Sequence, residues 1–323
     1  MLGCRSHHVS FAVNVLESVP LARSNPRSNG DWNRGGAWTI SGKIHASPGN
    51  GGRKSSLDSN ERGSIPYTYW SIKSDQADQV QGGLIEEGLV SIYVNGQEIA
   101  TLMCSPMEQE ALALGFLYNE GVIHSIDDVE LIRANVHRTA VDVFLKQQEF
   151  TPPRRMILTS GCGGGVSFID LAGMFPPLET RFATTPDVLL ERMRDLQGAA
   201  RLYRQVRGVH TSVLANEERM QISAEDIGRH NTIDKVAGKA LLERIETQDG
   251  ILLSSGRVSS EMIGKARQMG VPIIASRTSP TSITVRLAQT WNICVVGYVR
   301  QGGMRVYTHP SRLGLPDLPE GEI

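Results

Sequence analysis

A single cysteine stands inside a run of glycines in the segment SGCGGGVSF, residues 160–168. A thiol reacts as its thiolate, and a glycine loop leaves the sulfur uncovered while its N–H groups can converge on an anion. Cys162 is therefore a candidate nucleophile, although the pattern alone equally supports a buried cysteine in a turn. The other cysteines are poorer candidates, since Cys294 lies inside an apolar strand pattern, Cys104 ends one, and Cys4 lies in a polar N-terminal segment.

A second candidate site is the segment AEDIGRHNTIDKVAG, at the expected start of a helix. It carries six polar or ionisable groups: Asp226, Arg229, His230, Asn231, Asp234 and Lys235. A helix N-terminus favours anions, and Arg229 and His230 would reinforce that preference. His230 and Asp234 stand at i and i+4, so the carboxylate could orient the imidazole. The alternative is a capped helix start with a structural salt bridge, but so dense a mixture of charges favours function.

Hydroxyls and arginines fill the expected strand-to-helix loops that follow. The loop SSGRVSSE contains Arg257 and Glu261, either of which can meet a ligand at the end of a strand, and the next loop is SRTSPTS. Adjacent loops of this composition suit a phosphate-bearing ligand. The later segment GYVRQGGMRVYTH places Arg300 before two glycines, either as a plain hairpin turn or as a cationic loop over a bound anion.

The elements that must position these residues begin near Gly83. Residues 88–104 are two β-rich runs around an Asn-Gly pair, the strongest short hairpin signal. A helix is expected to follow and to end at Gly121, and residues 128–146 fit two more strands. We therefore predict a small α+β domain over residues 81–150.

In the larger part of the chain, segments with helical periodicity alternate with segments with strand periodicity. Helices are expected at 184–205, 230–245, 259–270 and 279–291, and strands at 209–216, 219–226, 250–255, 271–277, 292–299 and 304–309. Strands alternating with helices of this length predict βαβ units and a parallel or mixed sheet. We therefore expect an α/β fold with its larger domain over residues 151–315 and a short tail at 316–323.

Residues 1–80 differ from the rest of the chain. They are rich in Ser, Gly, Asn and Arg and show no sustained period. Such a segment buries too little apolar surface to offset its ordering entropy, so we expect a mostly disordered extension.

Composition excludes several classes of function. Of 323 residues, 40% are hydrophobic, and no apolar run approaches the ~20 residues that cross a bilayer. A net charge of −1 gives no general attraction to nucleic acid or to acidic membranes, so neither is an expected partner. The four cysteines are scattered, without a CxxC pair or a cysteine–histidine cluster, so we expect no structural metal and a reducing, cytoplasmic setting.

Five segments, in this order, resemble the formate dehydrogenase accessory sulfurtransferases, the FdhD family. The matching pieces are VNGQEIATLMCSPMEQEALALGFLYNEGVI, SGCGGG, AEDIGRHNTIDKVAGKAL, SSGRVSSEMIGKARQMGVPIIASRTSPTSITVRLAQ and GYVRQGGMRVYTHPSRL. They cover the chain from about residue 83 to about residue 313, and the first 80 residues fall outside the resemblance.

The resemblance implies a fold and an activity. The family combines a small α+β domain with a larger domain of cytidine-deaminase-like fold that has no zinc centre. Its members accept sulfur as a persulfide from a cysteine desulfurase. They pass it to the molybdenum (or tungsten) of a bis-molybdopterin guanine dinucleotide cofactor, which they bind as cargo. The resulting sulfido ligand activates formate dehydrogenase, and a homodimer is the family-level expectation.

The resemblance also assigns site residues. Cys162 aligns with the first cysteine of the family's C-G-x-C-G motif, the persulfide carrier. The cofactor-binding stretch aligns with Tyr298, Val299, Arg300, Gln301, Gly302 and Gly303. Arg229, His230, Asp234 and Arg257 are further candidate site residues.

One position departs from the family pattern, because Gly165 stands where a second cysteine is usual. A CxxC partner commonly lowers the pKa of its neighbour and can resolve it as a disulfide, but a persulfide needs only one sulfur. The sequence leaves open a second hypothesis, a non-catalytic chaperone that binds and inserts the cofactor. A nucleotide-modifying enzyme is a weaker third, since the HxE and PCxxC stretches of zinc deaminases are absent.

Overall fold

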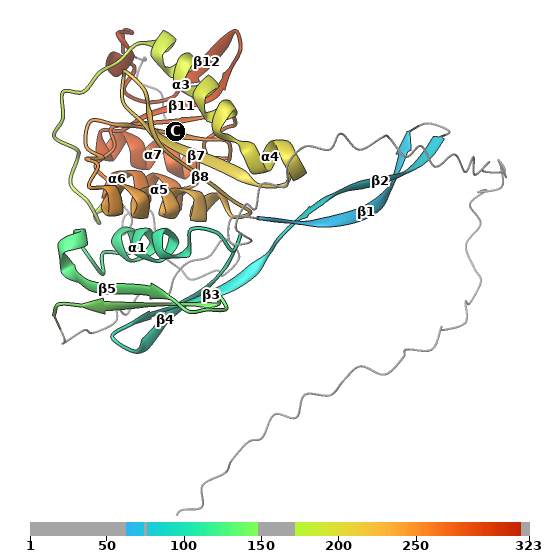
Figure 1. Cartoon of the computed structure of the whole chain (residues 1–323). Coiled ribbons are helices and arrows are strands. Elements are labelled where there is room, and N and C mark those ends of the chain that lie inside the picture. Colours follow the sequence, from blue (N-terminus) through green and yellow to red (C-terminus); the bar gives the residue numbers. More distant parts are fainter. Residues whose placement is uncertain (1–62, 74–75, 148–171, 318–323) are drawn as a thin grey trace, which may run out of the picture. The chain divides into compact units, whose positions relative to one another are not determined.

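The part of the chain that the structure describes contains three β-sheets (Figure 1). The computed structural model describes residues 63–73, 76–147 and 172–317, all within one unit that spans Gly49–Ile323. The other unit, Met1–Pro48, lies outside the described residues, and so do Cys4 and the glycine segment with Cys162.

The first sheet has four strands in the order β4-β3-β6-β5. Its strands are β3 (Gly88–Val94), β4 (Gln97–Cys104), β5 (Val129–Ala134) and β6 (Ala140–Leu145), and helix α1 (Gln109–Asn119) packs on it. Asn95 and Gly96 turn the β3–β4 hairpin with φ angles of 49° and 81°, which is why this dipeptide marks such turns. The predicted hairpin, helix and two further strands are confirmed.

The second sheet has six strands in the order β12-β11-β10-β9-β7-β8. They are β7 (His210–Ala215), β8 (Met220–Asp226), β9 (Ile251–Ser254), β10 (Ile273–Ser276), β11 (Cys294–Arg300) and β12 (Gly303–Val306). Strands β9, β10 and β11 are parallel, and β7 pairs antiparallel with both β8 and β9. The predicted mixed sheet is confirmed.

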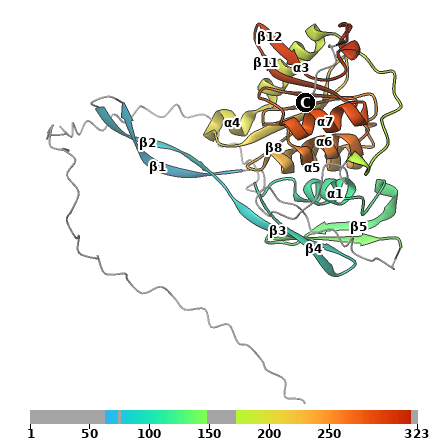
Figure 2. The ribbon, with the colours of Figure 1, turned by 180° about the vertical axis from the view of Figure 1, so that it is seen from behind.

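Helices cover both faces of this sheet (Figure 2). They are α3 (Pro186–Ala199), α4 (Arg201–Val206), α5 (Arg229–Glu243), α6 (Ser260–Gln268) and α7 (Ser282–Trp291), with short 3₁₀ turns at Ile126–Asp128 and Pro310–Leu313. One core joins α5, α6 and α7 to Leu252 and Ile274, and another joins α3 to Leu253 and Ala275. Successive strand residues point to opposite faces, so each strand supplies both cores.

Helices α1 and α5 approach each other unusually closely because each has a glycine at the contact. A β-carbon placed on Gly115 would stand 1.7 Å from the carbonyl oxygen of Asp234, and one on Gly238 would stand 1.8 Å from that of Ala111. No side chain fits there, so the two helix backbones meet directly. This contact holds the small sheet's helix against the larger sheet's helix.

The third sheet is a two-stranded antiparallel ribbon, β1 (Ser64–Lys73) and β2 (Gln76–Ile85). It lies largely within residues 1–80, so the expected start of order near Gly83 is wrong. Tyr67, Tyr69, Trp70 and Ile72 favour strand, but the composition of the whole 80-residue segment obscured this local signal.

Among the described residues, no helix is both long enough and apolar enough to span a bilayer.

Candidate functional site

The loops at one edge of the six-stranded sheet gather most of the predicted site residues. Strands β8, β9, β10 and β11 end at this edge, and β7, which runs the opposite way, begins there. We call it the carboxyl edge. Ligands of open α/β sheets bind in the crevice outside the carboxyl ends of the strands, so the topology favours this edge.

Hydrogen bonds tie the loops that follow β9 and β10 to each other and to the end of β11. Ser276 Oγ donates to the carbonyl of Gly256 over 2.6 Å, and Thr278 N donates to Ser276 Oγ over 3.0 Å. Tyr298 N in turn donates to the carbonyl of Thr278 over 3.0 Å. The hydroxyls of these loops therefore fix the loop backbones.

The predicted cofactor-binding stretch begins with two ordered residues. Tyr298 has a φ of 54°, a conformation that non-glycine residues rarely adopt, and the guanidinium of Arg305 lies 4.3 Å from the centre of its ring. Val299 is fully buried in the core beneath α3, so a ligand can reach only its backbone. Backbone strain of this kind often accompanies a binding loop.

The rest of that stretch is open to solvent. Arg300, Gln301, Gly302 and Gly303 are exposed in the turn between β11 and β12. Arg300 Nε donates one long hydrogen bond, 3.4 Å, to the carbonyl of Arg277, so most of its guanidinium is available to an anion. The structure thus presents an arginine and the backbone amides of the turn at Gln301 and Gly302 at the carboxyl edge.

His230 is held by two residues at the start of α6. Its Nδ1 lies 3.0 Å from Glu261 Oε2, and its Nε2 lies 3.0 Å from Ser259 Oγ. Burial of Glu261 opposes ionisation, but the hydrogen bond from His230 and the nearby positive charges outweigh it and hold the pKa of the carboxyl below its ordinary value. Because an ionised carboxylate only accepts, Nδ1 carries a proton and the ring orientation is fixed.

Asp234 does not orient His230, and that predicted pairing is wrong. Asp234 is buried and accepts hydrogen bonds from Asn119 Nδ2, over 2.7 Å, and from Lys265 Nζ. Side chains on a helix tilt toward its N-terminus, so the imidazole of His230 extends past the start of α5. Asp234, one turn later, lies among α1, α5 and α6 and stabilises their packing.

Arg229 opens α5 and has an incomplete set of partners. Its Nε is buried and has no hydrogen-bond partner among the described residues. A β-carbon placed on Gly256 would stand 3.1 Å from both Arg229 Cβ and His210 Nδ1, which locates the arginine against the loop after β9. A buried donor without a partner costs free energy, so this guanidinium suits a bound anion.

His210 is a site residue that the sequence analysis missed. It begins β7, and its Nδ1 lies 3.4 Å from Ser255 Oγ. Burial lowers the pKa of His210, and the charges of Arg229 and His230 lower it further, while Asp226 opposes them. No local sequence pattern marks this histidine. Only the fold brings it close to Arg229 and His230, which lie 19 and 20 positions later in the sequence.

Two charges of the predicted cluster turn inward and are structural. Asp226 and Lys235 are fully buried, with 2.7 Å between Oδ2 and Nζ. Lys235 also donates to the carbonyls of Ser105 and Glu225, and Asp226 accepts from Asn231 Nδ2. All three ammonium donors are therefore used, so these residues brace the site rather than meet a ligand.

Arg257 stands on the loop between β9 and α6. It is exposed and forms no hydrogen bond or ion pair with another residue of the described ranges. It therefore adds an exposed positive charge to the carboxyl edge. The predicted set is brought to this edge except for Asp234, and except for Cys162, which lies outside the described residues.

The two described cysteines are poor nucleophiles. Cys104 and Cys294 are fully buried, and burial raises the pKa of each thiol to about 12. Neither is a thiolate at neutral pH, which confirms their interpretation as core residues.

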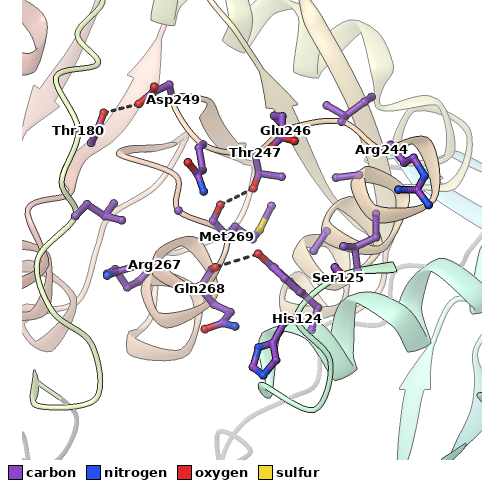
Figure 3. Close-up of a pocket in the computed structure, with 18 of the residues that line it drawn as sticks. His124, Ser125, Thr180, Arg244, Glu246, Thr247, Asp249, Arg267, Gln268 and Met269 are labelled. Atoms are coloured by element: carbon purple, nitrogen blue, oxygen red, sulfur yellow. Dashed lines mark hydrogen bonds between the residues drawn. The ribbon is translucent and has the colours of Figure 1, made fainter. Parts of the chain in front are cut away.

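A separate cavity of about 730 Å³ lies at the other end of α5 and α6, near their C-termini (Figure 3). Its walls include His124, Arg244, Thr247 and Arg267, and Thr247 donates to the carbonyl of Met269. None of the predicted site residues lines it. Chemistry and topology therefore favour the carboxyl edge over this cavity.

Comparison with known proteins places this geometry in a family. A sequence model described as FdhD/NarQ family matches residues 85–314. The chain is 30% identical over 262 residues to "Sulfur carrier protein FdhD" of Bacillus subtilis (strain 168), covering 79% of this chain and 99% of that protein. It is 37% identical over 239 residues to the protein of the same name from Wolinella succinogenes, covering 72% and 82%.

A solved structure is also similar. It is a crystal structure from Desulfotalea psychrophila, described as that of a candidate formate dehydrogenase accessory protein, with a TM-score of 0.66 and 26% identity. The match covers 78% of this chain and all of that chain, so the mixed α/β architecture is shared. With most of its length matched by the family model and by relatives at 30% and 37% identity, the chain belongs to the FdhD/NarQ family.

Proposed function

We propose that this protein is a sulfur carrier that acts as a sulfurtransferase in the maturation of formate dehydrogenase. Relatives at 30% and 37% identity are named sulfur carrier protein FdhD, and these names support the role. The observation that carries the proposal furthest is the buried, unpartnered Nε of Arg229 at the edge where three loops meet. It supports an anionic ligand at that edge.

The ligand we propose is the bis-molybdopterin guanine dinucleotide cofactor, bound as substrate. Its phosphates need cationic and N–H donors, and the carboxyl edge supplies Arg229, Arg257 and Arg300 together with the turn amides after Arg300. Arg277 lies beside Arg300 and adds a fourth guanidinium. His230, fixed by Glu261, can donate or hold a proton at the same edge.

Cys162 is the proposed carrier. In the first step its thiolate attacks the terminal sulfur of a donor persulfide, a new S–S bond forms, and the donor leaves as a thiolate. In the second step that S–S bond breaks and Cys162 keeps the bonding pair. The sulfur then leaves at the zero oxidation level, so the acceptor metal supplies the two electrons that make it a sulfido ligand. Both steps balance with a single cysteine, so Gly165 does not prevent them.

Five finer points belong to the same proposal. The donor is a cysteine desulfurase, the recipient enzyme is formate dehydrogenase, and the setting is the cytoplasm. The protein acts as a homodimer. The larger sheet belongs to the deaminase-like class, and its parallel strands, with α5, α6 and α7 on one face and α3 on the other, support that assignment.

Mass spectrometry of the intact protein after incubation with a cysteine desulfurase and cysteine tests the proposal. We expect the wild-type chain to gain the mass of one sulfur atom, and Cys162→Ala to gain none. A Cys162→Ala chain that still gains sulfur would show that another thiol is the carrier. Expression of Cys162→Ser in a strain that lacks the natural protein separates the two hypotheses. The chaperone hypothesis predicts that formate dehydrogenase activity is restored, and the sulfur-carrier proposal predicts that it is not.

A further inference from the structure

Three side chains at the carboxyl edge form a chain of hydroxyl, imidazole and carboxylate. Ser259 Oγ lies 3.0 Å from His230 Nε2, and His230 Nδ1 lies 3.0 Å from Glu261 Oε2. Helices α5 and α6 cover the same face of the six-stranded sheet, and the starts of these two helices supply all three residues (Figure 1). We call these residues the Ser259 triad. A serine nucleophile, a general base and an orienting carboxylate are held in this order in acyl-transfer enzymes.

The ionised carboxylate of Glu261 determines the direction of both hydrogen bonds. Burial of Glu261 opposes ionisation, but the hydrogen bond from His230 and the nearby positive charges outweigh it and keep the pKa of the carboxyl below its ordinary value. A neutral imidazole that donates from Nδ1 has its lone pair on Nε2, so Ser259 donates its hydroxyl proton to Nε2. The imidazole is therefore placed to accept this proton when the serine oxygen attacks a substrate.

Ser259 directs its hydroxyl to His230 although it occupies the position that usually caps a helix. It is the N-cap residue of α6, yet its side chain accepts no hydrogen bond from the N–H groups of that helix. Thr185 and Thr281, the N-cap residues of α3 and α7, both accept such a bond. An N-cap hydrogen bond stabilises a helix, so its loss at α6 costs stability. A residue that served only the fold would cap α6, and Ser259 pairs with the base instead.

The Ser259 triad is accessible, and hydrogen-bond donors lie beside it. The side chains of His230 and Glu261 are 20% and 31% exposed, and Ser259 is partly exposed. The N–H groups in the first turn of a helix have no intrahelical acceptor, and within the described residues no side chain caps those of α6. They begin at the residue after Ser259. N–H groups in such a place stabilise the oxyanion that forms during acyl transfer.

The charges around the Ser259 triad favour a substrate with an anionic group. Arg257, in the same loop, is exposed and forms no hydrogen bond or ion pair with another described residue. Arg229 precedes His230, and its buried Nε has no hydrogen-bond partner in the described part of the chain. Glu261 is already paired with His230. Both guanidinium groups can therefore pair with a phosphate or carboxylate of the substrate.

We propose that Ser259 is an activated nucleophile and that this protein hydrolyses esters that carry a phosphate or carboxylate group. Ser259 Oγ bonds to the acyl carbon while its proton passes to His230 Nε2, and the leaving oxygen takes that proton as its bond to the acyl carbon breaks. Water then attacks the acyl carbon and gives a proton to His230, the acid departs, and Ser259 regains its proton. No oxidant or reductant is needed. The reaction does not use Cys162, so it goes beyond the proposed function and either can fail without the other.

A fluorophosphonate probe tests the nucleophile, because it bonds covalently to a serine that a neighbouring base activates. Peptide mass spectrometry of the full chain after incubation with the probe should find the label on Ser259. His230→Gln should slow labelling by about 100-fold, since it removes the general base. A wild-type chain that gains no label on Ser259 overturns the inference, and this result does not depend on whether any variant folds.

Ser282→Ala is the matched control. Ser282 is exposed at the start of α7, where Thr281 caps the helix. No hydrogen bond joins it to a histidine of the described residues. Ser282 should stay unlabelled, and its variant should be labelled on Ser259 at the wild-type rate. Label on both serines at similar rates would show that Ser259 is not activated, which overturns the inference.

Hydrolysis of two esters tests the substrate class and the positioning role of Glu261. The hemisuccinate and the acetate of p-nitrophenol share a leaving group, and only the hemisuccinate carries a carboxylate. Wild type should show a kcat/KM about fivefold higher for the hemisuccinate, and Arg257→Ala should reduce this preference. Glu261→Gln should lower kcat and leave KM unchanged, because Glu261 acts through His230. Ser259→Ala that hydrolyses the hemisuccinate as fast as wild type overturns the inference, and equal kcat/KM values for the two esters overturn the anionic substrate.

Discussion

The chemistry of the carboxyl edge depends on a few side chains whose partners lie far away in the sequence. Arg229 and His230 open α5, yet His210, Ser259 and Glu261 determine their environment. His210 comes from the start of β7, and Ser259 and Glu261 come from the start of α6. The side chains are therefore fixed by packing, while the guanidinium groups of Arg229 and Arg300 keep capacity for a ligand.

Arg300→Glu should weaken the binding of guanosine diphosphate, a fragment of the proposed ligand, by at least about tenfold. The arginine supplies a charge-assisted hydrogen bond to phosphate, and its glutamate replacement repels phosphate. Isothermal titration measures the affinity. Arg133→Glu, which makes the same change of charge on an exposed strand of the small sheet, should bind as wild type. Equal affinities for the two variants would contradict the placement of the ligand at this loop.

His210 should make stability fall as the pH is lowered through the unfolded-state pKa of histidine, about 6.5. Burial lowers the pKa of His210 in the folded protein below the unfolded value of about 6.5, so the unfolded chain binds more protons as the pH falls. The contribution is complete above that value and is lost progressively below it. Urea unfolding at several pH values should show a smaller loss for His210→Asn than for wild type. His137→Asn, at an exposed position, should keep the wild-type slope.

At the scale of elements, the glycines at the contact of α1 and α5 determine how closely the two helix backbones approach each other. Gly238→Ala should lower the free energy of unfolding by about 3 kcal/mol, because its β-carbon meets the backbone of Ala111 and cannot rotate away. Gly264→Ala on α6 is the matched control, since nothing lies within 4 Å of its β-carbon. Helix propensity predicts that this control is unchanged or up to about 1 kcal/mol more stable. Similar losses in both would contradict the contact.

Much of the element pattern could be predicted from the sequence, and the failures have physical causes. Turn residues and hydrophobic periods are local, so the β3–β4 hairpin and the alternating helices and strands after residue 250 were predicted correctly. The β1–β2 ribbon was missed because its aromatic residues lie in a polar segment. The carboxylate predicted to orient His230 was wrong, because i and i+4 spacing on one helix ignores partners on another helix. His210 has no local signal in the sequence at all.

At the scale of the molecule, the two larger sheets are joined by buried polar groups as well as by α1 and α5. Lys235 on α5 pairs with Asp226 at the end of β8 and donates to Ser105, just after β4. Removing one partner of such a pair leaves a buried charge, so the joint is strongly specified. Asp226 and Lys235 flank Arg229 and His230 in the sequence, which couples the joint to the carboxyl edge.

The central claim is that Cys162 carries sulfur, and the most direct measurement is its state in protein isolated from cells. Peptide mass spectrometry after rapid alkylation should find a persulfide on Cys162, and none on Cys104 or Cys294, whose burial raises each thiol pKa to about 12. The persulfide should disappear in cells that lack cysteine desulfurase activity. A Cys162 found only as a free thiol in cells with an active desulfurase would contradict the account.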